Sequence, residues 1–347
     1  MDRSSLAVLF FCLGSLSLSA QAPAVTIGDS AAATSTFEDA QQMAAKGRLD
    51  KALNVLNQLS TETPIPAGVE RLRGSILYQK DELLEAVDAF KKAVAQDSTD
   101  RESIAKEGVT LFRLGRPKEA IEYLEQAQHE KVEHANVEPE YVLGLCYTDV
   151  SRYDDARHAF AVQYGFAPDS PEAYLLAGRM FLRREFRDPA AAQATKALEL
   201  NPNLPLAHEL LGEAALARGD LSGAIQELEA ERKINPMDGD VYDRLGDAYL
   251  RSGRLAEAQT SLNRAVLLEP SATGPYILLG QTLLKLKQPI EALHYLTRAE
   301  KMDPSNYITH NLLGQAYKAT GQVAEANREF QMVVDIQHKD DPKPAGK

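Results

Sequence analysis

The residues best suited to bind a metal stand together at His129-Glu130-Lys131-Val132-Glu133-His134. A zinc-protease helix needs its two histidines at i and i+4, so that both lie on one face. Here the spacing is i+5, which separates them by about 140° at ~100° per residue. We therefore interpret this segment as solvated linker residues rather than a metal site.

Other chemistry-bearing motifs are missing from the sequence. No G-x-S-x-G, G-x-G-x-x-G or P-loop string occurs. The only two cysteines, Cys12 and Cys146, are too few for a disulfide framework or a cysteine-based zinc cluster. We predict no catalytic residue, no cofactor and no metal, and therefore a protein that is not an enzyme.

The charge composition indicates which classes of partner the protein can bind. The 347 residues include 50 Asp and Glu against 38 Lys and Arg, a formal net charge of −12. Nucleic acids and anionic membranes are bound through clustered basic residues, so this acidic balance argues against both. We expect a protein or peptide as the partner.

The N-terminus has the features of a targeting segment. Residues Leu6 to Leu18 form an apolar run preceded by Arg3. That run is shorter than the ~20 residues a membrane span needs, but it fits the h-region of a signal peptide. Small residues follow, and cleavage is expected between Ala20 and Ala24. We predict a signal peptide over residues 1–24, export to the periplasm or outside, and no membrane insertion; the alternative is a buried N-terminal helix.

The rest of the chain is one repeated unit. A glycine column recurs every 34 residues, at Gly144, Gly178, Gly212, Gly246, Gly280 and Gly314, and alanine and proline columns share the period. Such a period indicates stacked supersecondary units. With one two-residue insertion near His134–Asn136, nine repeats span 33–340, at 33–66, 67–100, 101–136, 137–170, 171–204, 205–238, 239–272, 273–306 and 307–340. We expect residues 25–32 and 341–347 to be disordered.

Each repeat contains two apolar-periodic stretches joined by a short polar turn. In repeat seven, Leu245, Ala248 and Tyr249 follow the i, i+3, i+4 spacing of an amphipathic helix. Gly246 is small where the two helices must cross. Pro270 stands where the second helix should end, because proline lacks an N–H. The pattern predicts an all-α solenoid of helix pairs.

These columns resemble those of the tetratricopeptide repeat family. Repeat seven carries its aromatic, Leu-Gly, Tyr, Ala and Pro positions as Tyr242, Leu245-Gly246, Tyr249, Ala258 and Pro270. The resemblance implies a right-handed superhelical solenoid of paired antiparallel helices. It also implies that the first helix of each repeat lines a concave groove that binds a protein or peptide.

The repeat columns assign the isolated reactive side chains to packing or to solvent. His208 and His310 occupy the aromatic column, whereas His158 and His294 share a polar column that should face solvent. Cys146 occupies a column of apolar residues and is predicted to be a small core residue.

The candidate binding residues come from the five groove-facing positions that the family resemblance implies in each repeat. Repeats two to four place aromatic residues there, and repeats five to seven place charged ones: Tyr78, Phe112, Tyr141, Arg179, Arg183, Glu209, Glu213, Asp243 and Asp247. The acids stand where the family's carboxylate clamp would need basic and amide residues, which argues against a chaperone-tail adaptor. Two interpretations stay open, a solvated helix face and an acidic surface for a basic or mixed-charge segment.

A second candidate surface is the end of the array. Met332 and Ile336 are four residues apart on the last predicted helix, which has no successor to cover it. The hypothesis is docking of a partner or of a second copy end to end, and the alternative is a small patch of no consequence. The sequence thus predicts a non-catalytic interaction scaffold of the cell envelope. The alternatives are the recognition subunit of a separate enzyme or assembly machine and a self-assembling structural protein.

Overall fold

The computed structural model describes residues 30–128 and 139–340. Within these ranges the chain forms eighteen α-helices and no strand. The predicted signal peptide, the segment from His129 to His134 and the tail 341–347 lie outside the described residues. The chain divides into two compact units, Met1–Gly165 and Phe166–Lys347.

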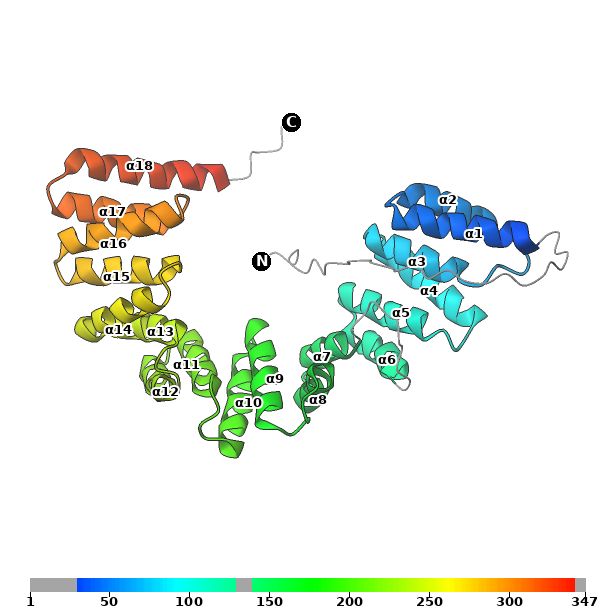
Figure 1. The fold of residues 1–347 in the computed structure, drawn as a ribbon, viewed down its shortest axis with the longest axis horizontal. Coiled ribbons are helices and arrows are strands. Elements are labelled where there is room, and N and C mark those ends of the chain that lie inside the picture. Colours follow the sequence, from blue (N-terminus) through cyan, green and yellow to red (C-terminus); the bar gives the residue numbers. More distant parts are fainter. Residues whose placement is uncertain (1–29, 129–138, 341–347) are drawn as a thin grey trace, which may run out of the picture. The chain divides into compact units, whose positions relative to one another are not determined.

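The first unit contains eight of the helices, in consecutive pairs (Figure 1). They are α1 (Ser30–Ala45), α2 (Leu49–Leu59), α3 (Val69–Gln79), α4 (Leu83–Gln96), α5 (Arg101–Arg113), α6 (Pro117–Gln128), α7 (Pro139–Asp149) and α8 (Tyr153–Tyr164). Helix α1 begins at Ser30, so residues 30–32 are helical rather than part of the expected disordered linker. The alanine-rich stretch that follows Ser30 favours this earlier start, because alanine has the highest helix propensity.

The second unit contains the other ten helices. They are α9 (Pro171–Arg183), α10 (Arg187–Leu200), α11 (Ala207–Arg218), α12 (Leu221–Ile234), α13 (Gly239–Arg251), α14 (Leu255–Leu268), α15 (Thr273–Lys285), α16 (Pro289–Met302), α17 (Tyr307–Ala319) and α18 (Val323–Asp340). Each predicted repeat from 171 onward contains one consecutive pair. The predicted all-α solenoid of helix pairs is therefore confirmed within each unit.

The glycine column marks the crossing of the two helices of a repeat. A Cβ atom added at Gly246 would lie 2.4 Å from the Leu262 side chain, which is fully buried. Ala258, on the other helix of this pair, is also fully buried. A larger side chain at Gly246 would separate the helices, so a small residue recurs at this position.

The proline column marks where each second helix ends. Helix α14 stops at Leu268, two residues before Pro270. Helix α18 instead continues to Asp340, one turn further than its predecessors, and His338 stands where earlier repeats have proline. Without a proline, nothing in the local sequence stops the helix there.

In the second unit the first helices of successive repeats form one layer. Helices α9, α11, α13, α15 and α17 each contact the next member of this series. The core lies between this layer and the second helices, and it contains Phe181 and leucines such as Leu245, Leu279 and Leu296. None of the helices in the described part of the chain is long and apolar enough to cross a membrane.

Candidate functional site

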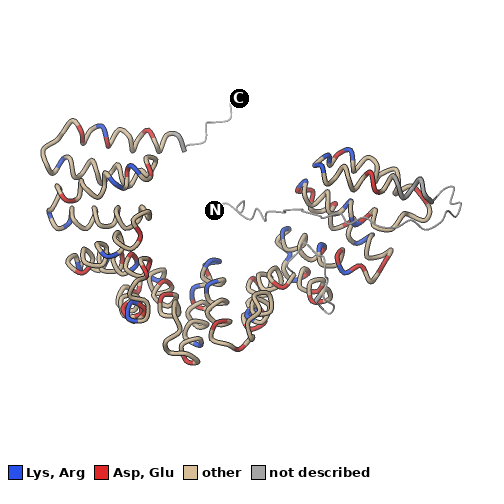
Figure 2. Tube along the Cα trace, viewed as in Figure 1, with Lys and Arg blue, Asp and Glu red and all other residues tan. Residues whose placement is uncertain are grey.

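The candidate residues of repeats five to seven lie on three neighbouring first helices. Arg179 and Arg183 belong to α9, Glu209 and Glu213 to α11, and Asp243 and Asp247 to α13. Because these helices contact in series, the structure brings the six side chains onto one layer of a single unit. Acidic and basic residues are interleaved along both units (Figure 2).

The centre of this surface is a chain of ion pairs around Glu209. The Glu209 side chain is only 4% exposed, and its carboxylate lies 2.9 Å from an Arg179 nitrogen and 3.2 Å from an Arg244 nitrogen. Arg244 also pairs with Glu213. Burial raises the pKa of the Glu209 carboxyl, and the positive charges of Arg244 and Arg179 counteract that rise in part. Two of the predicted acids are therefore neutralised by arginines of adjacent helices.

Asp243 differs from these acids. Its Oδ1 atom is buried and accepts no hydrogen bond from the described residues, and none of their ion pairs includes it. Burial raises its pKa to about 6, with Arg244 opposing this shift and the charges of Asp240 and Asp247 adding to it. Gly274, in the first turn of α15, leaves the space next to Asp243 open, since an added Cβ there would only reach Oδ2 at 3.8 Å.

The remaining predicted residues of this surface are more exposed. Asp247 pairs with Arg251 one turn later on α13, at 3.2 Å. Arg183 is exposed at the end of α9. Asp243 is thus the acid of this surface whose charge is least compensated.

Models of known families match most of the described chain. Models described as tetratricopeptide repeat match residues 40–101 and 181–238, 239–271, and 283–345, which together exceed half of the chain. The chain belongs to the tetratricopeptide repeat family. Another model, described as anaphase-promoting complex, cyclosome, subunit 3, matches residues 79–162. Comparison with curated proteins gives no match.

Several solved structures resemble part of this tetratricopeptide repeat chain. A crystal structure of MamA is 20% identical, covers 52% of this chain and 100% of its own, and has a TM-score of 0.47. YrrB, described as a TPR protein with an unusual peptide-binding site, is 21% identical over 53% of this chain and 95% of its own, also with a TM-score of 0.47. The Cut9–Hcn1 hetero-tetramer structure is 16% identical over 83% of this chain and 57% of its own, with a TM-score of 0.44.

The aromatic candidates belong to the other unit. Tyr141 packs against Phe160 of the same helix pair, with ring centroids 6.0 Å apart. The Arg113 guanidinium lies 4.5 Å from the centroid of the Tyr78 ring and pairs with Asp81 at 2.7 Å. Phe112 is half-buried. Tyr141 thus packs within its own repeat and Tyr78 against an arginine of the next one, and all three aromatic candidates belong to another unit than the acids of α11 and α13.

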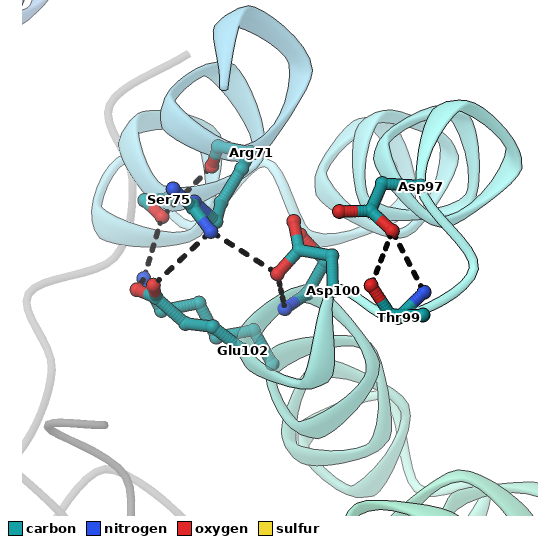
Figure 3. A network of polar contacts seen from close by, with 8 residues as sticks. Arg71, Ser75, Asp97, Thr99, Asp100 and Glu102 are labelled. Carbon is teal, nitrogen blue, oxygen red and sulfur yellow. Dashed lines mark hydrogen bonds and ion pairs between the residues drawn. The ribbon is translucent and has the colours of Figure 1, made fainter. Parts of the chain in front are cut away.

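The first-helix layer of that unit carries a polar network of its own (Figure 3). Arg71 of α3 lies 3.1 Å from the Asp100 carboxylate and 3.5 Å from that of Glu102. Lys106 of α5 donates hydrogen bonds to Ser75 at 2.9 Å and to Glu102 at 2.6 Å. As around Glu209, oppositely charged side chains of neighbouring first helices pair with one another.

The predicted end face of the array is on α18. Met332 is 44% exposed and Val334 is 42% exposed, whereas Ile336 is half-buried. The predicted burial of the isolated side chains is confirmed for Cys146, which is fully buried, for His310, which is buried, and for His158 and His294, which are exposed; His208 is half-buried.

Sequence reasoning missed Arg244, the residue that joins the acids of α11 to α13. Comparing Arg244 with the equivalent positions of other repeats would have identified it. The corresponding position holds leucine in the neighbouring repeats, at Leu176, Leu210, Leu278 and Leu312. A charged residue at a position that is otherwise leucine is a departure that marks this surface.

Proposed function

We propose that this tetratricopeptide repeat chain is a non-catalytic interaction scaffold, and that its second unit binds an extended protein segment across α9, α11 and α13. The observation that carries the proposal is Asp243. Its half-buried carboxylate has no ion pair among the described residues, and open space adjoins it at Gly274. A lysine or arginine of a bound segment would supply the missing counter-charge.

The surroundings of Asp243 define the kind of segment that fits. Arg179 and Arg244 are already paired with Glu209 and Glu213, so these four side chains offer directional hydrogen bonds but no net charge. Leu216 lies at a groove-facing position of the family pattern, about one turn beyond Glu213 on α11, and is only partly buried. We therefore propose a segment that combines one basic side chain for Asp243 with apolar side chains beside it.

The test compares charge reversals of equal size. An Asp243→Lys, Asp247→Lys double variant should lose the partners that the wild-type chain captures from the compartment of export, as quantified by mass spectrometry. The control is Asp188→Lys with Glu291→Lys, which changes the net charge equally but lies on the second helices α10 and α16. Equal capture by both double variants would discard the acidic surface as a binding site.

We also propose that residues 1–24 are a signal peptide and that the scaffold works in the cell envelope or outside the cell. Support comes from the apolar run Leu6 to Leu18 after Arg3, followed by small residues. N-terminal sequencing of the protein from fractionated cells should find a chain that begins between Gln21 and Val25. A protein that retains Met1 and fractionates with the cytoplasm would refute export.

A second candidate function is end-to-end self-assembly through α18. Met332 and Val334 are exposed apolar residues on a helix that no later repeat covers in the described chain. In sedimentation experiments, a Met332→Glu, Ile336→Lys double variant should shift any oligomer of the wild type towards the monomer. A wild type that sediments as a monomer at all concentrations would exclude this function.

A further inference from the structure

We propose that Glu300, His310 and Glu329 form a binding site for a divalent transition metal of the Zn²⁺ class in the last two repeats. The three residues come from three different helices, α16, α17 and α18. One ligand atom from each can be chosen so that all lie within 4.8 Å of one another. The site lies apart from the acidic surface of α11 and α13 and does not depend on the proposed scaffold function.

The imidazole of His310 is held in the orientation that such a site needs. The side chain is buried, and its Nε2 atom lies 2.9 Å from the Pro304 carbonyl oxygen. Both ring nitrogens face acceptor oxygens, so without an ion each carries a proton; with Nε2–H donating to the carbonyl, Nδ1 is the nitrogen that would give up its proton to a metal. Histidine ligands of metals are commonly fixed in this way, with the other ring nitrogen donating to a backbone carbonyl.

The Nδ1 side of the ring faces the Glu329 carboxylate. Nδ1 lies 2.7 Å from Glu329 Oε2, and Glu300 completes the group. Atoms bound to one Zn²⁺ ion at about 2.0–2.2 Å stand roughly 3 Å or more from one another. A small outward shift of Glu329, which is only partly buried, would therefore make room for an ion.

The charge and the donor types both favour a divalent ion. No lysine or arginine among the described residues forms an ion pair with Glu300 or Glu329. With a neutral imidazole, the two carboxylates give the group a charge of −2. One imidazole with two carboxylates suits Zn²⁺ and its first-row neighbours, whereas Mg²⁺ and Ca²⁺ prefer oxygen ligands alone. Three protein ligands leave a coordination position for water.

The repeat register supplies an internal comparison. Three repeats earlier, His208 Nδ1 lies 2.7 Å from Glu227 Oε2 in the same arrangement. The position that corresponds to Glu300 is Leu198 there, so this pair lacks the third ligand. A histidine–glutamate contact is therefore present in both repeats, whereas the third ligand is present beside His310 and absent beside His208.

The same register offers a substitution that should preserve the fold. Three repeats carry tyrosine at the position of His310, at Tyr174, Tyr242 and Tyr276. The hydroxyl donates to the proline carbonyl six residues earlier at 3.1 Å for Tyr242 and 3.3 Å for Tyr276. A His310→Tyr variant can make the equivalent bond to Pro304. It removes the metal ligand and keeps the residue type that neighbouring repeats use.

The experiment is a calorimetric titration of the chelator-treated chain with Zn²⁺, repeated with Co²⁺ to follow its visible absorption. Wild type should saturate at one ion per chain. His310→Tyr should abolish this binding, and Glu300→Gln should weaken it at least about tenfold, as expected for loss of a ligand. His208→Tyr is the matched control and should leave the affinity unchanged.

The other outcomes decide against the site. A wild type without saturable Zn²⁺ binding would overturn the proposal directly. So would binding that persists unchanged in both His310→Tyr and Glu300→Gln, because the ion would then be held by other side chains. Equal weakening by His208→Tyr would assign the effect to the histidine–glutamate pairs in general rather than to this group. Circular dichroism of each variant establishes that it is folded.

Discussion

Replacing Asp243 by asparagine should stabilise the folded chain at pH 8. The Asp243 carboxyl is half-buried on α13, its Oδ1 accepts no hydrogen bond from the described residues, and Asp240 and Asp247 add negative charge nearby. Ionisation of such a group is unfavourable in the folded state, because the charge loses its hydration without gaining an ion pair. Asparagine has nearly the same shape and carries no charge.

The size and sign of the effect follow from the pKa. The pKa of Asp243 is raised from 3.8 to about 6, so the folded state binds this proton more tightly than the unfolded state does. The unfolding free energy of the wild type therefore falls as the pH rises from about 4 to about 6, and the loss is complete above that range. At about 1.4 kcal/mol per pKa unit, the interval corresponds to about 3 kcal/mol. Because the side chain is partly solvated, we expect Asp243→Asn to gain about 1–3 kcal/mol at pH 8 and almost nothing near pH 4.

Urea unfolding followed by circular dichroism at several pH values measures this difference. Asp247→Asn is the matched control, since Asp247 lies on the same helix but pairs with Arg251. Its substitution should be neutral or slightly destabilising and should show no gain above pH 6. An Asp243→Asn variant that is no more stable than wild type at pH 8, or whose advantage grows as the pH falls, would refute the reasoning. Carboxyl NMR of the wild type should find the Asp243 pKa near 6.

Four further substitutions test the packing and the ion pairs. Gly246→Ala should cost about 1–3 kcal/mol in urea unfolding, because its Cβ would lie 2.4 Å from the buried Leu262 side chain. Glu209→Gln should cost about 1–3 kcal/mol by the same measurement, since it removes the carboxylate shared by two arginines. Ala258→Leu should also cost about 1–3 kcal/mol, whereas the exposed His294→Ala should change stability by less than about 0.5 kcal/mol. Equal effects of these last two would contradict the assigned repeat register.

The helix pairs could be predicted because each depends on residues of one repeat. The constraint at Gly246 is steric and local, so the same small residue recurs wherever the two helices of a repeat cross. The same holds for Pro270, which ends α14 by its own covalent structure. The start of α1 was placed too late because no glycine, alanine or proline column precedes the first repeat, and only local helix propensity acts there.

The position of the acidic surface on α11 and α13 could be predicted from the sequence, but the pairing of its charges could not. The family pattern placed Glu209 and Asp243 on the first-helix layer, and the structure has them there. It could not show that Glu209 is neutralised and Asp243 is not. That difference depends on which acids of α11 the Arg244 side chain of α13 can reach. The spacing of residues along the sequence gives no information about this distance between helices.

Arg244 also links stability to the proposed binding. Its position is occupied by leucine in the neighbouring repeats, so repeat seven gives up an apolar contact and places a guanidinium among four acids of α11 and α13. The Arg244 guanidinium forms ion pairs with Glu209 and Glu213. Its positive charge therefore only partly offsets the unfavourable ionisation of Asp243. A basic side chain bound beside Gly274 would complete the compensation. Binding should therefore strengthen as the pH rises through about 6, where Asp243 becomes ionised, and Asp243→Asn should remove this pH dependence while making the free chain more stable. An unpaired acid that lowers folding stability at the proposed binding surface is consistent with the general conflict between stability and function at binding sites.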